Sequence, residues 1–389
     1  MRVAVLSLTD PWHAPHGGTL RTRAIVDAVA RHGHDVVTVF PAPEGRAEAP
    51  RAPAGPPPGV RVVAVPAPTL GTRAWPEWVR RAKRTLVPLP TSLGGRSPAL
   101  ATALRDLAPV DLLVVSVLPF ARYAEDLPGT RLWVDHSDLY SDVIAREAAR
   151  RSGVARLTAM AQLHGVRRRE DALVRDAALT TAAGAADADA LARRSGGEVD
   201  WLPTPVAGGD VAAEPRSRPV AGFFANFGYW PNVDALVLLR ERWAPRLTDL
   251  GWDVLVAGLG SDEVDAGPLV RVLGPVASPR DFYRSVDVTV APVRVGGGMK
   301  VKVVESLAHG RPVVGTAFAA AGFPPGLAAA VEVVDPDEPD FAALREGPPP
   351  LPADLPGQLE PFTRRGFRSR VGGLLERASR PGTGSGADG

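Results

Sequence analysis

The amino-acid sequence predicts an α/β protein with two Rossmann-like domains. Short runs of β-branched apolar residues alternate with amphipathic helical patterns, which is typical of parallel βαβ units. Pro203, Pro205 and the pair Gly208-Gly209 interrupt this series, and it then starts again. A chain of 389 residues is also too long for one ordinary core, because domains average about 150 residues. We therefore expect two domains, joined near residues 204–218, with a ligand site in a cleft between the carboxyl ends of their strands.

The N-terminal series begins with a strand at Val3–Leu8 and a helix at Thr19–His32. The apolar residues of this helix share one face, and Gly33 is placed to end it. The Pro-rich stretch Pro41–Gly59 has almost no periodicity and predicts an exposed loop. The other strands of this half are expected at Val36–Phe40, Val60–Val65, Leu112–Val117, Leu132–Val134 and Ala178–Thr181, with helices near 98–107, 140–150 and 154–176.

The C-terminal series begins with a strand at Val220–Phe224 and a helix at Val233–Leu250. Pro231 precedes this helix and Gly251 follows it, as helix ends favour. Further strands are expected at Trp252–Ala257, Val270–Leu273, Val286–Ala291, Pro312–Gly315 and Val331–Val334.

These patterns predict four segments. An N-terminal domain takes residues 1–205 and a C-terminal domain takes residues 206–347. A Pro-rich linker and a last helix follow at 348–378, and we expect this helix to cross back to the N-terminal domain. The Gly/Ser-rich tail at 379–389 is expected to be disordered.

Composition excludes several classes of function. Lys plus Arg number 45 against 43 Asp plus Glu, a formal charge of +2 that is too balanced for a dedicated nucleic-acid binder. The chain has no cysteine, which excludes disulfides, thiolate metal sites and cysteine nucleophiles. The apolar run at Val3–Leu8 is shorter than the core of a signal peptide, which needs roughly 7–15 residues. No stretch reaches the roughly 18 apolar residues of a membrane span, so we expect a cytoplasmic protein.

The most informative segment is residues 292–316, PVRVGGGMKVKVVESLAHGRPVVGT. A strand ends at Ala291, three glycines follow at 296–298, and a helix is expected to begin near Met299. Glycines allow close backbone approach to an anion, and the N-terminus of a helix favours phosphate. Lys300 and Lys302 add positive charge there. Glu305 falls further along the helix, where a carboxylate can accept hydrogen bonds from two ribose hydroxyls.

This segment resembles the donor site of retaining GT-B glycosyltransferases of glycosyltransferase family 4. The resemblance extends to FANFGYWPNVDAL at 224–236, to LGPV at 273–276, and to PHGGTLR at 15–21, and it covers residues 1–345. It implies the GT-B fold and transfer of a sugar from a nucleotide-diphosphate donor with retention at the anomeric carbon. It also implies that no protein nucleophile is needed, because the leaving phosphate accepts the proton of the acceptor hydroxyl. The reaction it implies requires no metal and no cofactor.

Two positions depart from the family pattern. The first of the two family glutamates, seven residues apart, is replaced by Gly297, whereas Glu305 holds the second position, which binds the nucleotide ribose. A subset with a Gly-Gly-Gly-x-Lys-x-Lys loop has this same form. The Arg and Lys pair that commonly follows the first strand of the C-terminal domain is missing before Asn232. We expect Arg294, Lys300 and Lys302 to make the diphosphate contacts instead.

The resemblance implies the following roles. Lys300 and Lys302 would act in catalysis as charge stabilisers. The donor would contact Arg294, Gly297, Gly298, Met299, Glu305, Asn226, Gly274 and Val276.

The N-terminal half offers further candidates. Asp135 and His136 follow a predicted strand, where they could orient the acceptor or act as a base. Gly17 and Gly18 precede a helix that carries Arg21 in its first turn, a place for an anion or an acceptor oxygen. A tight strand-to-helix turn is the less favoured alternative for the two glycines. For Asp138, two residues after His136, helix capping is the favoured interpretation.

Two basic clusters remain. One joins Arg80–Arg84 to Trp75 and Trp78, and the other is Arg167–Arg169. A solvated helix face is the favoured interpretation of both, while contact of the first cluster with an anionic membrane or a phosphate-bearing acceptor stays open.

We therefore expect a hexosyltransferase that acts on a small-molecule or lipid-linked acceptor. A nucleotide-sugar epimerase of GT-B fold and a non-catalytic nucleotide-binding partner protein are the alternatives. The Ala-, Arg- and Pro-rich composition is that of a high-GC bacterial gene and favours natural-product or glycan biosynthesis.

Overall fold

The computed structural model of the chain describes residues 1–12, 17–42, 55–66, 97–149, 151–209, 211–212 and 214–380. It divides into an N-terminal unit, Met1–Leu202 with Phe367–Gly389, and a C-terminal unit, Pro203–Gly366. Both units are parallel sheets covered by helices, so the expected α/β class is confirmed.

The N-terminal unit is a seven-stranded parallel sheet in the order β3-β2-β1-β4-β5-β6-β7. Its strands are β1 Arg2–Leu6, β2 Asp35–Ala42, β3 Arg61–Pro66, β4 Leu112–Val115, β5 Arg131–His136, β6 Leu179–Ala182 and β7 Asp200–Trp201. Its helices are α1 Gly17–Arg31, α3 Pro98–Asp106, α4 Tyr140–Ala149, α5 Gly153–Asp176, α6 Ala185–Ser195 and α14 Arg364–Ser379, with a 3₁₀ segment at Leu118–Asp126.

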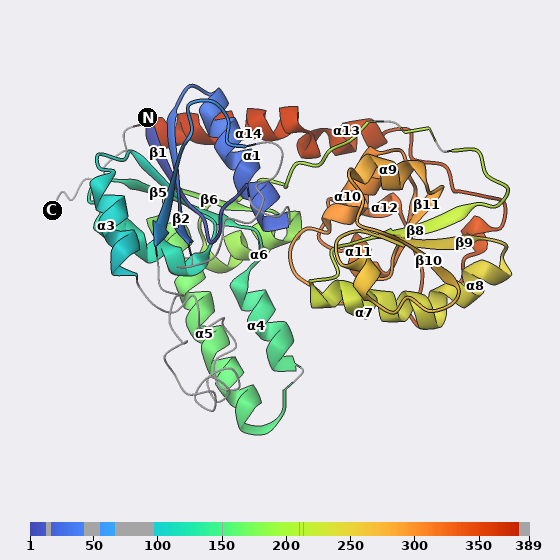
Figure 1. Cartoon of the computed structure of the whole chain (residues 1–389). Coiled ribbons are helices and arrows are strands. Elements are labelled where there is room, and N and C mark those ends of the chain that lie inside the picture. The colour runs from blue at the N-terminus through green and yellow to red at the C-terminus, as the bar shows by residue number, and fades with distance from the viewer. Residues whose placement is uncertain are drawn as a thin grey trace. The chain divides into compact units, whose positions relative to one another are not determined.

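Strand β1 shows how this sheet is buried on both faces. Val3 and Val5 pack into a core shared with α1 and α14, which lie along one face of the sheet (Figure 1). Ala4 and Leu6 point to the other face, which α3, the 3₁₀ segment and α5 cover. The continuous apolar run of β1 follows from this, because a strand covered on both sides needs no polar alternation.

The C-terminal unit is a six-stranded parallel sheet in the order β10-β9-β8-β11-β12-β13. Its strands are β8 Val220–Phe224, β9 Asp253–Ala257, β10 Val270–Gly274, β11 Val288–Ala291, β12 Val313–Gly315 and β13 Val331–Val333. Its helices are α7 Trp230–Leu238, α8 Ala244–Asp249, α9 Pro279–Arg284, α10 Val301–Ala308, α11 Ala317–Ala320, α12 Pro325–Ala329 and α13 Leu355–Leu359.

Several boundaries differ from the sequence expectation. Strand β1 ends at Leu6 rather than at residue 8, and α10 begins at Val301 rather than near Met299. The helix expected at 233–250 begins at Trp230 with Pro231 in its first turn, and a π-helical segment at Leu239–Trp243 joins α7 to α8. Within the expected loop at 41–59, residues 41–42 extend β2 and residues 43–54 lie outside the described part. Helix α6 was not expected, since its Ala-rich sequence lacks an apolar stripe.

The last segments of the chain belong to different units. The expected boundary was residue 205, and the structure divides the units after Leu202. The segment at 348–366 belongs to the C-terminal unit, whereas α14 buries Phe367, Val371 and Leu374 in the N-terminal core. Of the expected disordered tail, residues 381–389 lie outside the described part.

Candidate functional site

The sheet order of the C-terminal unit contains one topological switch point, between β8 and β11. From β8 the chain proceeds through β9 to β10 on one side, and from β11 through β12 to β13 on the other. The loops that follow two such strands diverge, and ligands of open α/β sheets bind in the crevice between them. Here those loops are residues 225–229 and 292–300. The glycine-rich segment of the sequence analysis therefore lies at the expected binding edge of its sheet.

The β11–α10 loop depends on two of its glycines. Gly296 has a φ of 139° and Gly298 a φ of 58°, both in the region that residues with a Cβ rarely adopt. Within the described part of the chain, no group accepts a hydrogen bond from the backbone N–H of residues 295–299. A row of such donors just before a helix is a suitable arrangement for an anion.

Lys302 lies on the β8 side of this loop. Its Nζ donates a hydrogen bond to Oδ1 of Asn232 at 2.5 Å and lies 4.8 Å from the centre of the Phe223 ring. Burial lowers the pKa of Lys302 to about 7, because the charged ammonium loses its hydration. A diphosphate at this edge would restore the charged form.

Lys300 and Arg294 have other neighbours. Lys300 Nζ donates to the carbonyl of Ala321 at 3.0 Å and lies 4.3 Å from the centre of the Phe318 ring, on the α11 side. Arg294 is exposed and forms a two-pronged ion pair with Asp234 of α7 at 2.9 and 3.1 Å. The three cations expected at the diphosphate thus contact different neighbours: Lys302 and Arg294 contact α7, and Lys300 contacts the segment after α11.

Glu305 lies on α10, one turn after Lys302. Tyr283 Oη donates to its carboxylate at 3.3 Å, and burial raises the pKa of Glu305 to about 7. Tyr283 in turn stacks on the His309 ring at 4.4 Å, and His309 Nδ1 donates to the Glu305 carbonyl at 2.7 Å. The carboxylate is therefore held in place with acceptor capacity remaining. Sequence reasoning missed Tyr283 as its neighbour, because that contact joins two separate elements, and it did not draw the contact with His309, which follows Glu305 by four residues at the end of the same helix.

The other expected donor contacts are loop residues near the same edge. Asn226 shapes the β8–α7 turn, where its Oδ1 accepts from the Gly228 amide at 2.9 Å and its carbonyl accepts from Asn232 Nδ2 at 2.7 Å. Gly274 ends β10 with a φ of 80°, and Val276 packs on the core that contains Tyr283. Gly297 and Met299 lie in the β11–α10 loop and are half-buried.

In the N-terminal unit, Arg21 and Asp135 form a buried ion pair. The guanidinium donates to both carboxylate oxygens, at 2.7 and 2.6 Å, and the two side chains are 1% and 0% exposed. Thr181 Oγ1 also donates to the carboxylate at 2.5 Å, and Arg21 donates to the Leu202 carbonyl at 2.6 Å. This geometry favours a positioning role for both residues over contact with a substrate, and their expected functional roles stay predictions.

His136 ends β5 next to this pair. Its side chain is buried, its Nε2 has no hydrogen-bond partner among the residues that the structure describes, and burial lowers its pKa. Gly18 lies in the first turn of α1, which begins at Gly17, and the preceding residues 13–16 lie outside the described part. The cluster at 75–84 also lies outside it.

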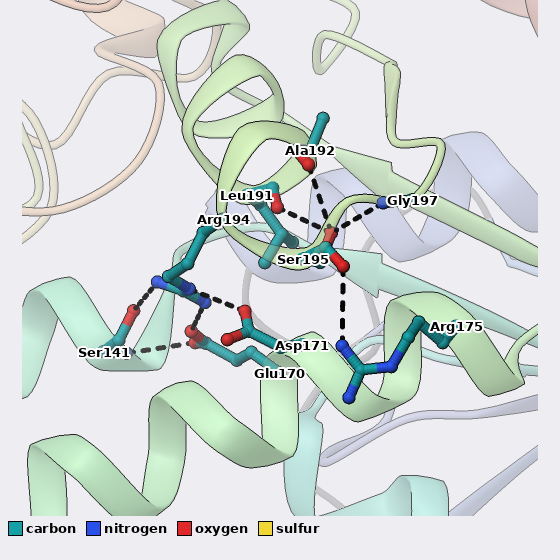
Figure 2. Close-up of polar contacts among 9 residues, drawn as sticks. All are labelled: Ser141, Glu170, Asp171, Arg175, Leu191, Ala192, Arg194, Ser195 and Gly197. Carbon is teal, nitrogen blue, oxygen red and sulfur yellow. Dashed lines mark hydrogen bonds and ion pairs between the residues drawn. The ribbon is translucent and has the colours of Figure 1, made fainter.

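A second polar network joins α4, α5 and α6 (Figure 2). Arg194 donates to Glu170 and to Asp171, both at 2.6 Å, and Glu170 also accepts from the Ser141 amide at 3.0 Å. Glu170 therefore helps to cap the N-terminus of α4, and the capping role favoured for Asp138 stays a prediction. No local pattern predicts a cap from 29 residues away.

The described ranges were compared with the requirements of a metal site and of a membrane-spanning helix. They contain no group of three or more His, Asp and Glu side chains that could hold a metal ion. None of the helices in those ranges is both long enough and apolar enough to cross a bilayer.

The family comparison concerns the C-terminal unit. Residues 218–343 match the family model described as glycosyl transferases group 1. No curated protein sequence matches the chain. The match covers β8 to β13 and therefore includes the switch-point loops, and it indicates a glycosyltransferase enzyme.

Solved structures with the same fold are GT-B glycosyltransferases. The sucrose-phosphate synthase of Thermosynechococcus elongatus is 14% identical with a TM-score of 0.65, covering 97% of this chain and 98% of its own. Anabaena HepE, solved with UDP and glucose, is 12% identical with a TM-score of 0.57, covering 96% and 99%. WaaG, a glycosyltransferase of lipopolysaccharide biosynthesis, is 15% identical with a TM-score of 0.53, covering 97% and 95%. These likenesses show the GT-B fold.

Proposed function

We propose that this protein transfers a hexose from a nucleotide-diphosphate sugar to a small-molecule or lipid-linked acceptor, with retention at the anomeric carbon. The observation that carries the proposal is that one switch point holds a lysine, a carboxylate and backbone N–H groups that no acceptor in the described part of the chain satisfies. These groups match the two halves of a nucleoside diphosphate. The complex of HepE with UDP and glucose, a structure of similar fold, supports the same class of donor.

The diphosphate would bind at the β11–α10 loop. The N–H groups of residues 295–299 and the ammonium of Lys302 would stabilise the charge that develops on the leaving phosphate. Lys300 belongs to the same loop, and turning its flexible side chain away from Ala321 would add a second ammonium. These residues would carry the part that the family assigns to the missing Arg and Lys pair.

The ribose would bind to Glu305. A carboxylate that accepts one weak hydrogen bond from Tyr283 keeps lone pairs for two vicinal hydroxyls. Its raised pKa fits this role, because no cation of the described residues pairs with this buried carboxylate, and the hydroxyls of a ligand would supply hydrogen-bond donors.

The transfer would need no covalent link to the protein. The bond between the anomeric carbon and the phosphate oxygen breaks as a bond to the acceptor oxygen forms on the same face. The leaving phosphate accepts the proton of the acceptor hydroxyl, and the products are a glycoside and a nucleoside diphosphate. The acceptor side is assigned to the N-terminal unit, where Asp135 and Arg21 would hold the ends of β5 and α1 in position.

Ligand binding tests the donor site. A thermal-shift panel of UDP, GDP, ADP and dTDP should stabilise the protein with one of them, because ligand at 100 times its Kd adds about 2.7 kcal/mol. By calorimetry, Glu305→Ala should weaken the binding of that nucleoside diphosphate far more than the binding of pyrophosphate. The same substitution at the exposed Glu332 is the matched control. No shift with any nucleotide, or equal losses for both ligands, would contradict the assignment.

Turnover separates the alternatives. The labelled sugar of a sugar nucleotide should be transferred only when an acceptor is present. The anomeric configuration of the product, measured by NMR, tests retention. A free epimer without acceptor would indicate the epimerase. Tight nucleotide binding without turnover against any acceptor would indicate the binding protein.

A further inference from the structure

We propose that the exposed face of α5 is a docking surface for an anionic lipid bilayer. This face comprises Val154, Leu157 and Met160 near the start of the helix and, further along it, Arg168, with Arg167 and Arg169 on its two flanks. The inference is independent of the transferase activity, because it rests on a surface of the N-terminal unit that no residue of the proposed donor site shares.

The helix is one arm of a hairpin. Helices α4 and α5 pack side by side and extend away from the N-terminal sheet (Figure 1). One face of α5 buries Ala159, Leu163 and Val166 against the body of the unit. The opposite face is exposed from Val154 to Arg168, and the beginning of α5 lies at the far end of the hairpin.

That far end is apolar. Val154 and Leu157 are 73% and 71% exposed, and Met160 is 49% exposed. Single exposed aliphatic residues are ordinary, but three within the first two turns of one helix form a contiguous apolar strip. Leaving Val and Leu side chains in water forgoes roughly 1.5–3 kcal/mol each relative to burial, so this strip favours insertion into an apolar phase.

The charge of the same segment points to an anionic surface. From Gly153 to Arg169 the sequence has four arginines and no acidic residue. Arg156 and the three arginines at 167–169 are all exposed. The acids that follow, Glu170 and Asp171, are neutralised by Arg194. An apolar strip with flanking arginines is the pattern of helices that lie on anionic bilayers.

The spacing also fixes the orientation. Ten residues of helix separate Leu157 from Arg167, which is about 15 Å at 1.5 Å per residue. The polar region of one leaflet is only about 5–8 Å thick. Both groups reach one bilayer together only when the axis of α5 lies close to the membrane plane. A second copy of the chain fits this surface less well, because a two-fold pairing of antiparallel helices would place the arginines of each copy against the apolar strip of the other.

Vesicle flotation of the full chain tests the proposal. The wild type should float with vesicles of phosphatidylcholine and phosphatidylglycerol and not with phosphatidylcholine alone. The double variant Val154→Ser/Leu157→Ser and the triple variant Arg167→Gln/Arg168→Gln/Arg169→Gln should each bind about ten-fold more weakly or worse. Leu269→Ser, an exposed apolar residue of the C-terminal unit, is the control and should bind as the wild type does.

The absence of cysteine permits a local measurement. A polarity-sensitive fluorophore on Leu157→Cys should shift to the blue when anionic vesicles are added, and the same label on Leu269→Cys should not. This readout applies to any variant whose circular dichroism matches the wild type. Equal binding to neutral vesicles, flotation without a response at residue 157, or a response that grows with protein concentration in the absence of lipid would each overturn the proposal. The last result would assign the face to a second copy of the chain.

Discussion

Lys302 and Asn232 are joined by a hydrogen bond of 2.5 Å between Nζ and Oδ1. Asn232 also donates from Nδ2 to the Asn226 carbonyl, so one amide side chain links the lysine of α10 to the turn that follows β8. Asn232 therefore connects α10 to the β8–α7 turn, beside the Arg294–Asp234 ion pair that connects the β11–α10 loop to α7. A ligand that binds Lys302 would therefore compete with Asn232 Oδ1 for a hydrogen bond from the Lys302 ammonium.

The first prediction concerns the pH dependence of nucleotide binding. The pKa of Lys302 is lowered to about 7, so its ammonium is present below that pH and is lost as the pH rises. The affinity ratio of the wild type to Lys302→Met for UDP should therefore fall above pH 7, by at most about ten-fold per pH unit. Calorimetry between pH 6 and 9 checks this, and using the ratio cancels the ionisation of the ligand. A ratio that stays constant would show that Lys302 is not a diphosphate ligand.

The second prediction concerns stability. The pKa of Glu305 is raised from 4.5 to about 7 in the folded protein, so the folded state binds more protons than the unfolded state between those values. Its contribution to stability is fully present below pH 4.5 and is lost as the pH rises through 7. Glu305→Gln should thus raise the free energy of unfolding at pH 8 by about 2–3 kcal/mol, while nucleotide binding weakens.

Urea unfolding at pH 5 and pH 8 checks this second prediction. The gain should be much smaller at pH 5, and Glu332→Gln on the exposed side of β13 should show no gain at either pH. A variant that is less stable than the wild type at pH 8 would mean that Glu305 already has its full set of partners.

Sequence patterns predicted the strands well because a strand buried on both faces is a continuous apolar run. They placed β8 at its observed bounds and put the glycine-rich loop directly before α10. They also singled out Glu305 and Lys302 as neighbours on one helix, because helical spacing is a local property.

Partners from distant segments were beyond such patterns. Tyr283 reaches Glu305 across 22 positions, and Asp135 meets Arg21 across 114. The sequence placed both members of the second pair near a ligand, since both follow or precede loops at strand ends. It could not show that each neutralises the other, because ion pairing between two elements depends on how the sheet orders them.

The third prediction tests the β11–α10 loop with two adjacent glycines. Gly296 has a positive φ of 139°, whereas Gly297 does not have a positive φ. Gly296→Ala should therefore cost about 1–3 kcal/mol in backbone strain and weaken nucleotide binding, because the N–H groups change direction. Gly297→Ala is the matched control and should leave the free energy of unfolding nearly unchanged. Thermal unfolding with and without UDP measures both effects, and equal effects of the two substitutions would refute the dependence on φ.

The fourth prediction separates structure from chemistry at Asp135. Removing the carboxylate leaves Arg21 charged and buried without its partner, so Asp135→Ala should lower the free energy of unfolding by about 3–5 kcal/mol. The double variant Arg21→Leu/Asp135→Leu should lose clearly less than the sum of the single changes, because it leaves no isolated charge. Asp189→Ala, an exposed acid of the same unit, provides the control in urea titrations.

Turnover completes the test of Asp135. If Asp135 only positions its neighbours, the activity of Asp135→Ala should fall together with its stability. The activity should then recover at lower temperature, where the folded fraction is restored. If Asp135→Asn kept the stability of the wild type and still abolished turnover, the carboxylate would belong to the reacting groups. The hydrogen bonds from Arg21 and Thr181, which use both carboxylate oxygens, lead us to expect the first outcome.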